Sequence, residues 1–134
     1  MVAGKAGRSP THSPVVEAII EAEHGTTAEI RVHLSKHWFE PNPLKRASRL
    51  FDRFGMQSTR DRNGVLLYVN LRRRKIAVVA DDGALTAIDK HYWEKLVQQL
   101  KAHLRGTHPE RAIALAVLEI GDCLRQHFPV EKTQ

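Results

Sequence analysis

The chain has 134 residues, 42% of them apolar and 27% charged, which is the length and composition of one soluble globular domain. Its formal net charge is +6 at pH 7, but no zinc-finger, RNP-like or recognition-helix pattern accompanies the charge, so nucleic acid is not an expected partner. No apolar run approaches the roughly 20 residues that span a bilayer, and no secretory leader is recognised, so we expect a cytoplasmic protein.

The first half of the chain predicts a helix, a strand and a second helix. Residues 1–13 are rich in Gly, Ser, Thr and Pro and are expected to be a disordered lead-in. Ser13 is a predicted N-cap with Pro14 at the first helical position, and Gly25 ends that helix. Its apolar stripe is Val15, Val16, Ile19 and Ile20. Residues 28–34 alternate apolar and polar side chains, which predicts a strand with one buried face.

A second capped helix follows a loop that begins with `HWFEPNP`. Asn42 is the predicted N-cap, Pro43 opens the helix and Gly55 ends it. The side chains expected on its buried face are Leu44, Ala47, Phe51 and Phe54. The polar segment `MQSTRDRNG` then predicts a loop.

The second half predicts a hairpin and two helices. Residues 64–71 and 76–80 are the most apolar strand candidates, and their short connection favours an antiparallel hairpin. A long helix is expected over residues 85–105, and Pro109 opens the last one. Interleaved helices and strands in this order predict an α/β domain over residues 14–129, with helices on the faces of a sheet and a short tail at 130–134.

Several residue types that often carry chemistry are more simply explained as structural. The histidines have no metal-site spacing such as HExxH, so a zinc site is not expected. The single cysteine, Cys123, excludes an internal disulfide and is expected to be a core thiol. Trp93 is expected to be a core anchor.

The adjacent aspartates Asp81 and Asp82 are the strongest candidate site. They follow a buried strand, and an antiparallel hairpin brings the loop with Asp61 and Asn63 to the same edge of the sheet. Carboxylate and carboxamide oxygens are the ligands that Ca²⁺ and Mg²⁺ prefer. The alternative is that Asp81, Asp82 and Gly83 are turn residues that lead into the next helix.

The turn of the hairpin is strongly basic and carries Arg72, Arg73, Arg74 and Lys75. This basic hairpin tip is either a solvated turn that protects a sheet edge or a surface for acidic lipid or protein.

An ordered set of segments resembles the TPM domain family, and in particular its short bacterial branch. The segments are `AEHGTTAEIRVHL`, `LFDRFGM`, `TRDRNGVLLYV`, `KIAVVADDG`, `HYW` and `HFP`, and they run from about residue 14 to residue 129. The resemblance implies an α/β/α sandwich around a short mixed sheet, which agrees with the order of elements above.

The same resemblance suggests residues for function. The acidic signature of the family falls on Asp81 with Gly83 after it, and Glu29 matches a second acidic position. Asp82 stands where the branch often has a basic or polar residue. The family includes calcium-binding members, a phosphatase, and members that act in membrane-protein repair or receptor trafficking.

Three hypotheses follow. The first is a domain that binds a divalent metal, Ca²⁺, through Asp81, Asp82 and the loop with Asp61 and Asn63. The second is a metal-assisted phosphatase in which Arg60 or Arg62 stabilises the transferring group. Its base would be Glu29 or Asp81. The third is an interaction module in which the basic hairpin tip meets a membrane-associated protein or an anionic surface.

Overall fold

The computed structural model describes residues 13–131. The predicted lead-in lies outside these residues except for Ser13, as does the end of the predicted tail. In chain order the elements are α1 (Pro14–Glu23), β1 (Ile30–Ser35), α2 (Pro43–Arg53), a 3-10 turn (Met56–Ser58), β2 (Val65–Asn70), β3 (Lys75–Ala80), α3 (Asp82–Ala87), α4 (Lys90–His103) and α5 (Pro109–His127).

The three strands form one mixed sheet in the order β1-β2-β3. β1 and β2 are parallel, whereas β2 and β3 are antiparallel, with Val65 opposite Ala80 and Asn70 opposite Lys75. The predicted hairpin is therefore confirmed. Its register places the residues that precede β2 beside those that follow β3.

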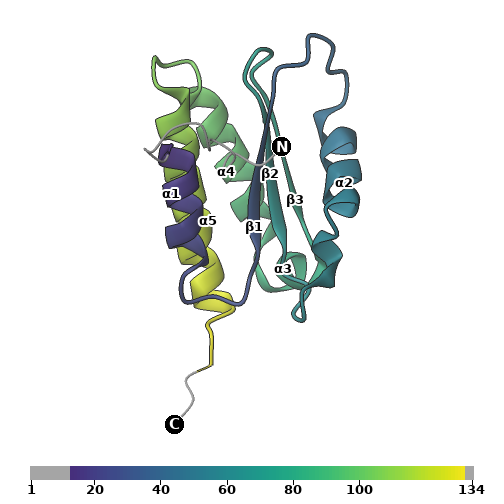
Figure 1. Cartoon of the computed structure of the whole chain (residues 1–134), viewed down its shortest axis with the longest axis vertical. Coiled ribbons are helices and arrows are strands. Elements are labelled where there is room, and N and C mark those ends of the chain that lie inside the picture. Colours follow the sequence, from purple (N-terminus) through teal and green to yellow (C-terminus); the bar gives the residue numbers. More distant parts are fainter. Residues whose placement is uncertain (1–12, 132–134) are drawn as a thin grey trace.

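Helices cover both faces of the sheet and make three layers (Figure 1). α1, α4 and α5 pack on one face, and α2 packs on the other together with Met56 of the 3-10 turn. β2 is buried on both faces because its alternate side chains enter different cores: Val65, Leu67 and Val69 face the larger helical layer, and Leu66 and Tyr68 face α2. The predicted α/β/α sandwich is confirmed.

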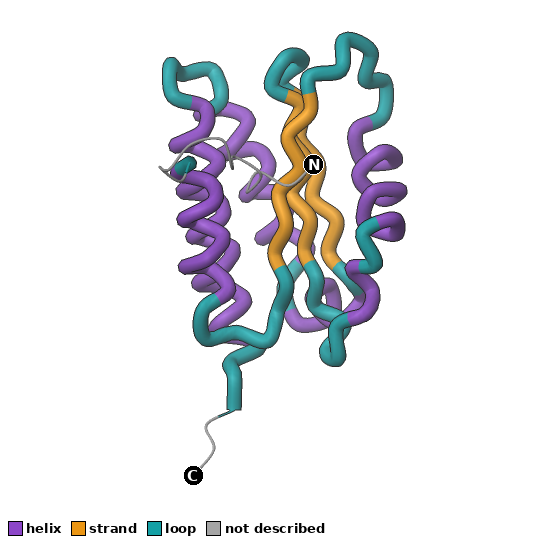
Figure 2. Tube along the Cα trace, viewed as in Figure 1, coloured by secondary structure: helices purple, strands orange, loops and turns teal. Residues whose placement is uncertain are grey.

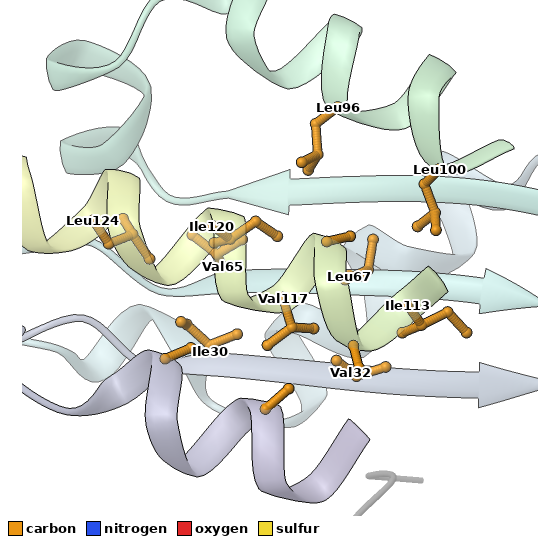
Figure 3. Packing of buried hydrophobic residues seen from close by; sticks show 14 of the residues in the cluster. Ile30, Val32, Val65, Leu67, Leu96, Leu100, Ile113, Val117, Ile120 and Leu124 are labelled. Carbon is orange, nitrogen blue, oxygen red and sulfur yellow. The ribbon is translucent and has the colours of Figure 1, made fainter. Parts of the chain in front are cut away.

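The larger core lies between the sheet and helices α4 and α5. Figure 3 shows Val32 and Leu67 of the sheet pointing toward side chains of these helices, among them Leu100 and Val117. Trp93 is 7% exposed in the same core, as predicted. α1 closes the layer against α5, where a Cβ added to Gly121 would lie 2.6 Å from the Cα of Ala22.

The single helix predicted over residues 85–105 is wrong. The chain forms two helices, because Ile88 is extended (φ −119°, ψ 130°) and Asp89 caps the start of α4 by accepting a hydrogen bond from the His91 N–H. The first of the two begins earlier than expected, since Asp81 is its N-cap. Asp82 is therefore a helical residue.

Two members of the predicted apolar stripes are exposed. Ile20 of α1 is 60% exposed and Leu44 of α2 is 55% exposed. α1 buries Val15, Ala18 and Ala22, and α2 buries Ala47, Leu50 and Phe51. The apolar spacing predicted both helices correctly. Which of the apolar side chains are buried depends on the elements that pack against each helix. Within residues 13–131 no helix has the length and apolar character needed to cross a membrane.

Candidate functional site

The loop before β2 and the start of α3 meet at one edge of the sheet. The Asp81 N–H donates to the Gly64 carbonyl at 2.9 Å, and the Gly83 N–H donates to the Arg62 carbonyl at 2.8 Å. A Cβ on Gly83 would lie 2.1 Å from the Asp61 carbonyl oxygen, so glycine alone permits this contact. We call the surface formed by Asp61, Asn63, Asp81 and Asp82 the acidic loop edge. Figure 1 shows α3 at this end of the molecule.

Asp81 has both of its carboxylate oxygens engaged. They accept a fork of hydrogen bonds from the Arg62 guanidinium, at 2.7 and 2.8 Å, and one oxygen also accepts from the Asp82 N–H at 2.8 Å as the N-cap of α3. The hydrogen bonds from Arg62 hold the pKa of the Asp81 carboxyl below its usual range. Its side chain is 6% exposed. Asp81 therefore follows β3 directly, caps the start of α3 and pairs with the guanidinium of Arg62.

Arg62 reaches Asp81 from a left-handed backbone conformation, with φ at 51°. This region costs a non-glycine residue roughly 1–2 kcal/mol, and the two backbone hydrogen bonds that its carbonyl accepts from Gly83 and Ala84 help to hold it there. The Arg62 side chain remains 50% exposed, so the guanidinium has a path to solvent.

A chain of hydrogen bonds orders the rest of the loop. The Asn63 amide donates to the Thr27 hydroxyl at 2.9 Å, and this hydroxyl donates to the Asp61 carboxylate at 2.7 Å. The bond from Thr27, reinforced by Arg60, lowers the pKa of Asp61. Asn63 is fully buried, yet its Oδ1 has no hydrogen-bond partner among the described residues. An unpaired buried acceptor costs roughly 1–3 kcal/mol, so this oxygen calls for an explanation.

The predicted site residues divide into two groups. Asp61, Asn63 and Asp81 are brought together, whereas the Asp82 side chain is 87% exposed and stands 4.0 Å from the Arg62 guanidinium. Within residues 13–131 no group of three or more His, Cys, Asp or Glu side chains is arranged to hold a metal. A cation could gather the carboxylates only after the Arg62 guanidinium leaves Asp81.

The residues considered for phosphoryl transfer are also occupied or exposed. Arg62 is forked to Asp81. The Arg60 side chain is 77% exposed and lies 3.4 Å from Asp61. Glu29 pairs with Arg31 at 3.6 Å.

The opposite end of the sheet carries features that the sequence reasoning missed. In the loop between β1 and α2, Trp38 and Phe39 are 71% and 82% exposed. The Arg72 guanidinium of the basic hairpin tip lies over the Trp38 ring, 4.1 Å from its centroid. Two adjacent aromatic residues in a predicted loop were the available signal. The strand register separates this end from Asp81, as predicted from the hairpin.

Comparison with known proteins identifies both fold and family. The model of the TPM domain family matches residues 9–123. The NMR structure of BA42 protein from the psychrophilic bacterium Bizionia argentinensis is similar, with a TM-score of 0.78 and 28% identity over 88% of this chain and 81% of that one.

A second solved structure shares the fold alone. The N-terminal domain of cg2496 protein from Corynebacterium glutamicum has a TM-score of 0.64 and 9% identity, over 90% of this chain and 76% of that one. No curated protein matches the chain.

Proposed function

The chain belongs to the TPM domain family, and we propose that it binds a divalent cation at its acidic loop edge, Ca²⁺ in preference to Mg²⁺. The observation that carries the proposal is the buried Oδ1 of Asn63, which has no hydrogen-bond partner among the described residues. The Nδ2 of the same amide is linked through the Thr27 hydroxyl to the carboxylate of Asp61. A bound cation would give the Oδ1 of Asn63 a partner. Carboxylate and carboxamide oxygens at an irregular loop suit Ca²⁺, because Mg²⁺ demands near-ideal octahedral geometry.

Charge at this edge also favours a cation. The three carboxylates of Asp61, Asp81 and Asp82 exceed the two guanidiniums of Arg60 and Arg62 by one negative charge. Asp82 adds a carboxylate next to Asp81 and is free to swing, since it is 87% exposed. Like charges this close repel, and a divalent ion between them relieves the repulsion.

Arg62 is the internal competitor of the ion. Its guanidinium occupies the Asp81 oxygens that a cation would use, and its half-exposed side chain can move into solvent when the ion arrives. Solvent screens a partly exposed ion pair, so its loss changes a binding constant by no more than a few fold. Removing the guanidinium should therefore tighten Ca²⁺ binding by a few fold. If Arg62 instead assisted binding, its removal would weaken it.

The test is calorimetric titration with Ca²⁺ and with Mg²⁺, followed by amide NMR shifts, on wild type and three variants. We expect Arg62→Ala to bind Ca²⁺ more tightly, Asp81→Asn to bind it at least tenfold more weakly, and Arg60→Ala, the matched control on the same loop, to change affinity less than Arg62→Ala. Asp82→Asn keeps the cap of α3 intact, so it tests the charge if Asp81→Asn fails to fold. Equal affinity of Arg62→Ala and wild type, or Ca²⁺-induced shifts confined to residues outside this edge, would refute the proposal.

A further inference from the structure

Hydrogen bonds hold the loop between β1 and α2 so that its two aromatic side chains are exposed. Asn70 donates to the His37 carbonyl at 3.0 Å and to the Glu40 carboxylate at 2.8 Å, and Lys75 donates to the Glu40 carbonyl at 2.7 Å. The Tyr68 hydroxyl also donates to Glu40, whose side chain is 5% exposed. The backbone is thus fixed on both sides of Trp38 and Phe39, which hold their rings out into solvent.

Exposed cations lie on the two loops at this end of the molecule. Lys36, Arg72, Arg73 and Arg74 are exposed, and Arg72 covers one face of the Trp38 indole. Figure 2 shows the hairpin turn and the loop between β1 and α2 at the same end of the molecule, away from the C-terminal end of α5.

Phe39 also borders a groove on the side of α2. The groove has a volume of about 460 Å³, and four of its lining residues are the cations Lys45, Arg46, Arg49 and Arg53. Glu40 is the one carboxylate among its lining residues, and it is already paired with Tyr68 and Asn70. The Nε of Arg46 is buried and has no partner among the described residues. The groove is therefore complementary to a small anionic group.

We propose that this end of the molecule docks on an anionic phospholipid bilayer. Trp38, whose indole is amphipathic, would sit at the level of the headgroups, and the apolar ring of Phe39 would insert beside it. The groove beside Phe39 would receive a lipid phosphate. Each lysine or arginine held near anionic lipid strengthens binding by roughly fivefold. The inference is independent of the proposed cation site.

A bilayer fits these features better than single-stranded nucleic acid. Base stacking needs open aromatic faces along a groove that follows the phosphate backbone. Here Arg72 covers one face of Trp38, and the cationic groove lies to one side of Phe39 and not between the two rings. Rings at a projecting end, bordered by cations, are suited to shallow insertion into a flat surface.

The experiment measures co-sedimentation and tryptophan emission of the full chain with phosphatidylcholine vesicles, with and without phosphatidylserine. We expect binding only with phosphatidylserine, together with a blue shift of the emission. The shift comes from Trp38, because Trp93 is 7% exposed and already buried. Trp38→Phe should therefore retain binding and lose the shift.

Two matched pairs of variants locate the surface. Trp38→Ser with Phe39→Ser should weaken binding at least tenfold, whereas Leu115→Ser, at a residue of α5 that is 68% exposed, should not. Charge reversal at Arg72 and Arg73 should weaken it by more than tenfold, whereas Arg60→Glu at the other end should not. Equal binding to both kinds of vesicle would overturn the proposal. So would control variants that lose as much vesicle affinity as the test variants, or a polyuridine strand that displaces the protein from vesicles.

Discussion

Alanine at position 83 should disrupt the contact between α3 and the loop that precedes β2. The added Cβ would lie 2.1 Å from the Asp61 carbonyl oxygen and 2.7 Å from the Arg62 carbonyl oxygen. Carbon and oxygen normally approach no closer than about 3.3 Å, so the loop has to retreat by roughly 1 Å. Both obstacles are backbone atoms and cannot rotate aside as a side chain would.

The cost has three parts. Overpacking costs about 1–3 kcal/mol, and the hydrogen bonds that Gly83 and Ala84 donate to the Arg62 carbonyl are stretched, at about 1 kcal/mol each. Alanine recovers about 0.5–1 kcal/mol of helix propensity. The free energy of unfolding of Gly83→Ala should therefore fall by about 2–4.5 kcal/mol, which lowers the Tm by roughly 10–15 °C for a domain of this size.

Urea and thermal denaturation provide the measurement, and Gly106→Ala provides the matched control. Gly106 has a negative φ, and the nearest atom to an added Cβ there is 3.4 Å away, so its stability should change by less than about 0.5 kcal/mol. Gly83→Ala should also weaken Ca²⁺ binding, because the loop carrying Asp61 and Asn63 moves away from Asp81. A Gly83→Ala protein as stable as wild type would show that the close approach is not a constraint.

Three further experiments test other parts of the structure. Gly121→Ala should destabilise the protein by about 1–3 kcal/mol in urea, and Ala22→Gly should fail to rescue it, since the Cα of Ala22 itself would lie 2.6 Å from the new Cβ. Tyr68→Phe removes a donor from the buried carboxylate of Glu40, which should cost about 1–3 kcal/mol and reduce the urea midpoint. Burial lowers the pKa of His33 to about 4, so protonation favours the unfolded chain. The contribution of neutral His33 to the free energy of unfolding is fully present above about pH 6.5. It is lost as the pH falls toward 4. Urea denaturation at several pH values should show a flatter profile across this window for His33→Gln.

The sequence predicts the sheet well because its signals are local. Alternation in residues 28–34, two apolar runs and a short connection between them are enough for a strand and a hairpin. The register then follows, and with it the meeting of Asp61, Asn63 and Asp81 at one edge.

The ion pair between Asp81 and Arg62 could not be predicted, because it depends on one unusual backbone angle. Arg62 reaches the carboxylate only from its left-handed conformation, and an arginine in a polar loop gives no sign of that. The break at Ile88 was missed for another reason: this residue continues the apolar stripe of α4 and is buried with it. Asp89 was the available signal, because aspartate is a preferred N-cap.

The hairpin also determines how the two proposed surfaces relate. Val65 pairs with Ala80 near the acidic loop edge, and Asn70 pairs with Lys75 at the basic hairpin tip. Six strand residues at about 3.3 Å each separate these ends by roughly 20 Å, whereas salt at physiological strength screens exposed charges over roughly 8 Å. The cations at the tip therefore cannot compete for Ca²⁺ in the way we propose for Arg62. Charge reversal at Arg72 and Arg73 should weaken lipid binding by more than tenfold and leave calorimetric Ca²⁺ affinity unchanged. A Ca²⁺ affinity that rose with that reversal would mean that the two surfaces share one electrostatic field.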